Sequence, residues 1–184
     1  MIRLALASVL IVSACAQSTM SVEAYAAAIE VASAVYIDEA QSLSAAYQAS
    51  VEDEVRAVVE EAPDVAQGRV VEIATTATAN YLALLSDAMG RFVTAIEELR
   101  PPTGIEAAHD EFVAAVGSVH RSLPATRDAV AQADSLASVR FALTSSGFAD
   151  GQGRWTAACT ALEEAVRGEG TGVDLGCVRR DLAP

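Results

Sequence analysis

Apolar residues recur at steps of three and four along most of the chain after residue 20, and this spacing predicts amphipathic helices. A first helix is expected from Ser21, which can cap it, to Pro63, which ends it. Ser50 and Asp53 could restart the helix, so the pattern allows one long helix or two pieces. The apolar stripe of this segment contains Val22, Tyr25, Ile29, Tyr36, Leu43, Tyr47, Val51, Val55 and Val58.

The tyrosines of this stripe have two interpretations. Tyr25, Tyr36 and Tyr47 share one face of the expected helix, where they could line a ligand pocket. Large side chains at helical spacing more often belong to the hydrophobic core, and the sequence favours that interpretation.

A second helix is expected from Asp64 to Arg100, where Pro101 and Pro102 stop it. The connection at Pro63 is short, so the first two helices are expected to pack antiparallel. The apolar positions of the second helix keep the same spacing: Val70, Ile73, Ala77, Tyr81, Leu84, Ala88, Phe92, Ile96 and Leu99.

The third helical segment opens on a capping-box pattern. The Thr103 side chain would accept a hydrogen bond from an amide of the first turn, and the Glu106 side chain would reach back to the amide of Thr103. Pro124 lies inside the apolar pattern that follows and is expected to kink or split the helix. Ser135 could cap a further short helix.

The remainder of the chain is rich in glycine. Residues 144–153 have a loop composition, and a last helix is expected over residues 154–167. The tail at residues 168–184 contains several glycines and is expected to be irregular or briefly extended. No internal repeat is evident.

The first fifteen residues have a different build. Arg3 supplies one positive charge, an apolar run covers residues 4–12, and small residues at 13 and 14 directly precede Cys15. This is the arrangement of a secretory signal. The run is well short of the ~20 residues that a spanning helix needs, so a membrane anchor made of helix is not expected.

The end of this segment, Val12-Ser13-Ala14-Cys15, resembles the lipobox of bacterial lipoproteins. The resemblance implies that residues 1–14 are a signal peptide, that Cys15 carries a diacylglycerol, and that residues 15–20 form a short tether. The protein would then lie on the outer face of the plasma membrane, in the cell envelope. A plain secretory signal and retention in the cytoplasm are the alternatives.

These patterns together predict an all-α fold: an elongated antiparallel bundle of three to four helices after a signal peptide. The bundle domain would cover residues 21–184. Aromatic residues make up only 5% of the chain, so the core is expected to consist largely of alanine, valine and leucine, which let helices approach closely.

The charge balance limits the partners. The chain has 25 acidic residues, its 12 basic residues are all arginine, and its formal net charge is −13. Nucleic-acid binding needs clustered positive charge, and charge-driven binding to anionic headgroups needs the same, so neither is expected. The protein would contact the membrane through the lipid on Cys15.

Two cysteines remain if Cys15 is lipidated. An even pair in an exported chain predicts a disulfide between Cys159 and Cys177, which would staple the tail to the last helix. Two buried free thiols are the alternative.

Catalytic and metal-binding patterns are missing or incomplete. Glu106 and His109 match a Glu-x-x-His element of di-iron bundles, but Gly117 stands where the glutamate before His120 would be needed. The chain has no lysine for a phosphate-binding loop and no serine nucleophile motif. We expect no catalytic residue, no metal and no cofactor, with His109 packed near the Pro-Pro turn.

Several short pieces resemble a group of uncharacterised helical lipoproteins of GC-rich Gram-positive bacteria. The pieces are residues 99–103 (Leu-Arg-Pro-Pro-Thr), His109, residues 155–162 from Trp155 through Cys159, and residues 173–177 ending in Cys177. The resemblance covers most of the chain after about residue 70. The resemblance implies a lipoprotein location and a helical fold, and it implies no function.

The function expected from the sequence is a membrane-anchored, extracytoplasmic and non-enzymatic binding module for an envelope protein partner or a small ligand. A structural or assembly role through pairing of helices between copies is the first alternative, and a metal carrier is the second. The oligomeric state is left open by the sequence.

Overall fold

The protein is described by a computed structural model over residues 20–61, 64, 66–145 and 147–177. Within these residues the chain forms helices and no strand, which confirms the expected all-α bundle. The signal segment 1–14 and Cys15 lie outside the described residues. The helices are α1 (Val22–Glu61), α2 (Ala66–Glu97), α3 (Glu106–Ala131), α4 (Leu136–Ser145) and α5 (Phe148–Gly168).

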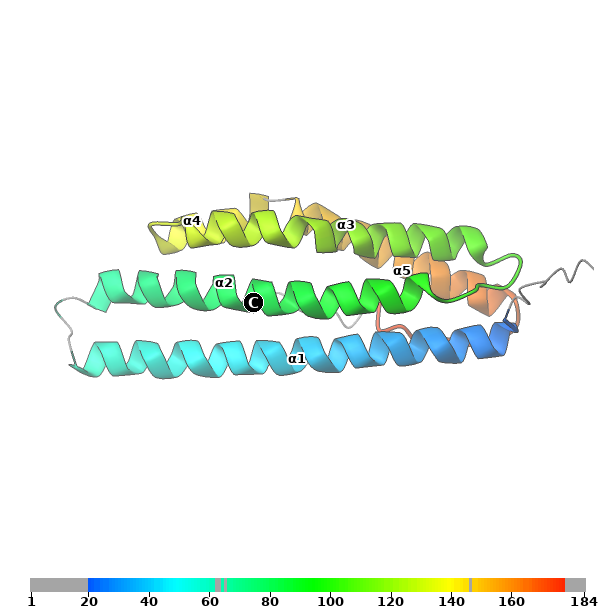
Figure 1. Ribbon diagram of the computed structural model, residues 1–184, viewed down its shortest axis with the longest axis horizontal. Coiled ribbons are helices and arrows are strands. Elements are labelled where there is room, and N and C mark those ends of the chain that lie inside the picture. The colour runs from blue at the N-terminus through cyan, green and yellow to red at the C-terminus, as the bar shows by residue number, and fades with distance from the viewer. Residues whose placement is uncertain (1–19, 62–63, 65, 146, 178–184) are drawn as a thin grey trace, which may run out of the picture.

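The long helices lie side by side in an elongated bundle (Figure 1). α1 and α2 form an antiparallel hairpin, α3 packs on α2, and α5 packs on α3. The short helix α4 turns the chain round, so that α5 returns toward the end of the bundle where α1 begins. None of the helices in the described residues is long and apolar enough to cross a membrane.

α1 is one continuous helix of 40 residues, about 60 Å long at ~1.5 Å per residue. The possible restart at Ser50 is therefore not used. Its fully buried residues end at Ala40. The end of α1 and the start of α2 extend beyond α3 and α4 (Figure 1). Val51 and Val55, near the end of α1, are only half-buried.

The core runs along the centre of the bundle and combines aliphatic and aromatic side chains. Tyr36 stacks on Phe92 with ring centroids 5.0 Å apart, and Phe92 meets Phe112 edge-on at 6.2 Å. Such pairs add about 0.5–1.5 kcal/mol each beyond the area that they bury. Ile96, Ile105, Val116, Leu162 and Val166 are completely buried around them.

The capping box at the start of α3 was a wrong prediction. The first helical residue is Glu106 and the preceding cap residue, Ile105, makes no side-chain cap bond. The amide of Gly104 donates to Glu106 Oε2 at 2.6 Å. Gly104 adopts φ +99°, a left-handed turn that only glycine enters without strain, and this turn separates Thr103 from the helix.

Pro124 lies within α3 and does not split it. A proline removes one amide from the ladder. Ser122 Oγ also donates to Val119 O at 2.7 Å and Thr126 Oγ1 to Ser122 O at 2.9 Å, so both hydroxyls near the proline bond within the helix. Ser135 caps α4 as expected, because its Oγ accepts from the amide of Ser138 at 3.1 Å.

The expected loop over residues 144–153 is mostly helical, which corrects the sequence interpretation. α4 continues to Ser145 and α5 already begins at Phe148. Gly151 is buried in α5, where a Cβ atom would lie 3.0 Å from Val119 Cγ2. The glycine therefore serves a close approach of α5 to α3 and not a loop.

Candidate ligand-binding pocket

A pocket of about 520 Å³ lies between the α1–α2 hairpin on one side and α4 with α5 on the other. This volume falls within the ~300–1,000 Å³ of typical small-molecule sites. α3 contributes none of its lining. The hairpin supplies mainly apolar and aromatic residues, among them Tyr36, Tyr47, Tyr81, Leu82, Leu85 and Met89.

Aromatic rings form both ends of the hairpin wall. At the inner end, Tyr36 contacts Trp155 of α5 with ring centroids 5.7 Å apart. Toward the tip of the hairpin, the rings of Tyr47 and Tyr81 lie 5.1 Å apart. The Tyr47 hydroxyl and Thr78 Oγ1 share a hydrogen bond of 3.0 Å, which fixes the orientation of the ring.

Burial changes the electrostatics of this wall. The pKa of Tyr81 is raised, mainly because burial disfavours the phenolate and secondarily because Tyr47 is close. The Tyr81 phenol is therefore neutral at physiological pH. The wall is apolar in its body and offers hydrogen bonds only at its edge.

The polar side chains of the pocket gather on the opposite wall. Arg140 and Thr144 are one turn apart on α4, and Gln152 and Thr156 are one turn apart on α5. The Thr144 hydroxyl donates to Arg140 O at 3.0 Å, and the Thr156 hydroxyl donates to Gln152 O at 3.0 Å. Because both threonine protons are used, Arg140 and Gln152 supply the donors of this wall that can reach a ligand.

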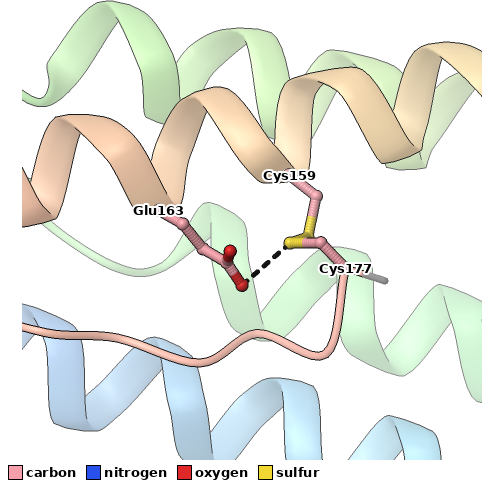
Figure 2. A group of neighbouring side chains, drawn as sticks. All are labelled: Cys159, Glu163 and Cys177. Carbon is pink, nitrogen blue, oxygen red and sulfur yellow. Dashed lines mark hydrogen bonds between the residues drawn. A yellow bond between two sulfur atoms is a disulfide. The ribbon is translucent and has the colours of Figure 1, made fainter. Parts of the chain in front are cut away.

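Residues 173–177, in the carboxyl-terminal tail, run between α1 and α5 (Figure 2). Two carboxylates hold its backbone: Glu30 Oε1 accepts from the amide of Asp174 at 2.8 Å, and Glu163 Oε1 accepts from the amide of Leu175 at 2.8 Å. The tail in turn buries Val173 and Leu175. We call residues 173–177 the strap.

The disulfide between Cys159 and Cys177 is present, with an S–S distance of 2.05 Å and a Cα–Cα distance of 5.7 Å. Both half-cystines are buried, and Glu163 Oε1 lies 3.0 Å from Cys177 Sγ (Figure 2). The bond joins the strap to α5 as expected. Since Cys159 follows Trp155 by one helical turn, the strap is fastened next to the pocket.

The close fit of the strap also involves α1. Gly176 adopts φ +67°, and a Cβ atom there would lie 3.0 Å from Ile37 Cδ1. The Gly176 amide donates to Asp174 Oδ1 at 2.9 Å, which closes the turn locally. Ile37 directly follows Tyr36 of the pocket wall, so the strap supports α1 where the pocket begins.

The histidines lie elsewhere in the bundle. His109 is buried in α3 and shares a hydrogen bond of 2.9 Å with the Tyr25 hydroxyl. His120 packs against Gly90 of α2. Within the described chain, one group of three potential metal ligands lies close together: Cys159, Glu163 and Cys177. Its two sulfur atoms are bonded to each other, so a single carboxylate is left to bind an ion.

The sequence interpretation favoured a core role for the tyrosine stripe over a pocket, yet Tyr36 and Tyr47 line the pocket, and the polar half was missed altogether. Tyr36 and Tyr47 share the stripe for which a pocket was considered. Arg140 and Gln152 carried no signal, because the segment between them was interpreted as a loop and the approach of α4 and α5 to the hairpin is a tertiary arrangement. In comparisons with known proteins, no family model, no curated protein and no solved structure matches the chain.

Proposed function

We propose that this protein is a lipid-anchored, extracytoplasmic binding module that holds a small, mainly apolar ligand between its helices. The pocket is the observation that carries the proposal. Apolar pockets with a few convergent polar groups, placed between helices of a bundle, are the usual form of small-molecule sites. A purely structural bundle would gain stability from filling this space with side chains.

The lining of the pocket supports binding without catalysis. General acid–base and nucleophilic catalysis mostly use histidine, carboxylate, cysteine or lysine side chains, and a hydroxyl nucleophile such as threonine or tyrosine needs one of these groups beside it as a base. The lining residues include no histidine, carboxylate, cysteine or lysine. The buried histidine, His109, bonds to Tyr25 away from the pocket.

The position of the amino-terminal end supports a membrane-proximal arrangement. Met20 donates its amide to Arg100 O at 3.4 Å, so the chain enters the bundle beside the connection between α2 and α3. Five tether residues before it reach at most ~3.5 Å each. A lipid on Cys15 would therefore hold this end within roughly 20 Å of the membrane, with the hairpin tip directed outward.

Two measurements test the proposal. Wild-type protein should incorporate labelled fatty acid and partition into detergent, while Cys15→Ser should do neither; equal labelling of both proteins would contradict the lipid anchor. Native mass spectrometry of the Cys15→Ser chain should detect a bound small molecule that organic solvent extracts.

A space-filling substitution tests whether the pocket holds that molecule. Ala74 lies half-buried on α2 and lines the pocket. Ala74→Phe should remove the bound molecule while the circular dichroism spectrum stays helical. Ala161→Phe, at an exposed position of α5, adds the same ring outside the pocket and should leave binding unchanged. Equal occupancy in the two variants would contradict binding at this site.

A structural role through helix pairing has a separate, smaller observation in its favour. Val31 and Val35 are one turn apart on α1 and remain 64% and 62% exposed. Stable interfaces bury about 800 Å² per partner, and two valines contribute a small part of that area. Sedimentation at increasing protein concentration tests this alternative, which predicts a dimer that Val31→Glu dissociates. The metal carrier has the least support, because the group of potential ligands found among the described residues has disulfide sulfur in place of thiolate.

A further inference from the structure

The charge of the pocket lining is opposite to that of the protein. The chain carries 25 acidic residues and a formal net charge of −13, yet no aspartate or glutamate lines the pocket. Arg140 is the one charged residue of the lining. A negatively charged group that would be repelled at most of this surface meets a positive charge here.

Arg140 is available to such a group. The described residues hold several arginine–carboxylate pairs, made by Arg56, Arg69, Arg91 and Arg127, and none includes Arg140. A guanidinium offers donors in a planar fork that matches carboxylate and phosphate oxygens. The Gln152 amide, on the same wall, adds a neutral donor.

The rest of the pocket suits an apolar body. The opposite wall is built from rings and aliphatic side chains, including Tyr36, Leu82, Leu85 and Met89. Leu136, beside Arg140 on α4, stays 51% exposed at the edge of the pocket and would be covered by a ligand. Burial of apolar area supplies most of the binding free energy in such sites, and a charged contact supplies orientation.

We propose that the pocket takes a single-chain amphiphile with an anionic head, the head binding at Arg140 and the chain lying against the tyrosine wall. This inference rests on the proposed function, since it names the ligand class for the same pocket. A carboxylate head and a phosphate-monoester head share the required chemistry. A second copy of the chain, inserting apolar side chains, is the competing occupant.

The only tryptophan of the chain makes the test direct, because Trp155 lines the pocket. The full chain carrying Cys15→Ser is stripped of bound lipid and titrated with hexadecanoate, hexadecyl phosphate and hexadecanol while Trp155 fluorescence is recorded. Octanoate and dodecanoate extend the carboxylate series to shorter chains. We expect saturable changes, with the two anions binding about tenfold more tightly than the alcohol, as for a charge-assisted hydrogen bond.

Arg140→Gln should lower the affinity for the anions to that for hexadecanol and leave hexadecanol unchanged. Arg127→Gln is the matched control, since Arg127 is a half-buried arginine of α3 outside the pocket, and it should keep the preference. Comparison of hexadecanoate with hexadecyl phosphate identifies which head the site prefers.

The outcomes separate the two proposals. If alcohol and anions bind equally, or if Arg140→Gln retains the preference, the anionic-head inference is wrong and the binding module stands. If no probe binds and Ala74→Phe and Ala161→Phe behave alike, both proposals fail. A fluorescence change that depends on protein concentration without any probe would identify a second copy as the occupant and overturn the amphiphile.

Discussion

The hydroxyl of Tyr25 on α1 lies 2.9 Å from Nδ1 of His109 on α3, with the two rings arranged edge to face at 5.7 Å. Both side chains are buried, Tyr25 completely. The bond therefore links the start of α1 to α3, although α1 packs chiefly on α2. Burial raises the pKa of Tyr25 and lowers the pKa of His109, so both partners are neutral at physiological pH.

Removing the Tyr25 hydroxyl should destabilise the bundle. Tyr25→Phe keeps the ring and leaves Nδ1 of His109 buried without its partner, which costs about 1–3 kcal/mol of unfolding free energy. Urea denaturation measures the loss. Tyr47→Phe removes a hydroxyl that bonds to Thr78 at the half-buried edge of the pocket and should cost less. Coincident transitions for wild type and Tyr25→Phe would contradict a stabilising bond.

The same pair makes stability depend on pH. Burial, the larger effect, lowers the pKa of folded His109 below its ordinary ~6.5, while nearby Asp110 opposes the shift. The unfolded chain then binds more protons than the folded chain, so unfolding free energy should fall as pH drops below about 6.5. The loss stops growing once pH is below the folded pKa. His109→Gln should flatten this part of the profile.

Denaturation midpoints measured at intervals from about pH 7.5 to pH 5 test this pH dependence. The range lies above the pH at which most carboxylates titrate. His120→Gln is the matched control, because it keeps the buried histidine and should retain the slope. A slope that persists in His109→Gln, or that disappears in His120→Gln, would assign the pH dependence to another group.

The helices were predictable from sequence because their apolar residues repeat at three and four along long segments. Tyr25, Tyr36 and Ile29 mark the buried face of α1 correctly. The pattern could not show where full burial ends along α1, since Val51 and Val58 continue the apolar stripe but are only half-buried. How far a helix is buried depends on the helices that pack against it, and its own sequence does not show where that packing ends.

The errors fell where glycine has a tertiary role. Gly151 was interpreted as a loop residue from local composition, but it sits in α5 to admit Val119 of α3. The capping box failed because Gly104 makes a turn that sets Glu106, and not Thr103, against the backbone. The polar wall of the pocket could not be predicted either, because Arg140 faces the tyrosines only once α4 has packed against the hairpin.

Loss of the disulfide should destabilise the strap and the bundle together. Cys159 and Cys177 close a loop of 18 residues, which contributes about 3 kcal/mol in the chain-entropy model. The double variant with serine at both positions should unfold at lower urea by that amount, and Trp155 fluorescence should change because Cys159 is one turn away. Glu163→Gln keeps the disulfide and should cost less. Equal midpoints with and without reductant would rule out a stabilising staple.

Two glycines of α5 should respond oppositely to alanine. At Gly153 nothing lies within 4 Å of an added Cβ, so Gly153→Ala should stabilise the helix by about 0.5–1 kcal/mol. At Gly151 the added atom would meet Val119 Cγ2 at 3.0 Å, and Val119 is completely buried with a branched side chain that cannot turn aside. Overpacking of this kind costs about 1–3 kcal/mol, more than the helix propensity returns.

Thermal unfolding of Gly151→Ala and Gly153→Ala beside wild type decides between a packing role and a loop role for this segment. We expect a lower midpoint for Gly151→Ala and a higher one for Gly153→Ala. A second substitution, Val119→Ala, removes the methyl groups that Gly151 faces and should relieve part of the cost in the double variant, because two contacting residues couple non-additively. If both alanine variants are more stable than wild type, α5 does not approach α3 closely at Gly151.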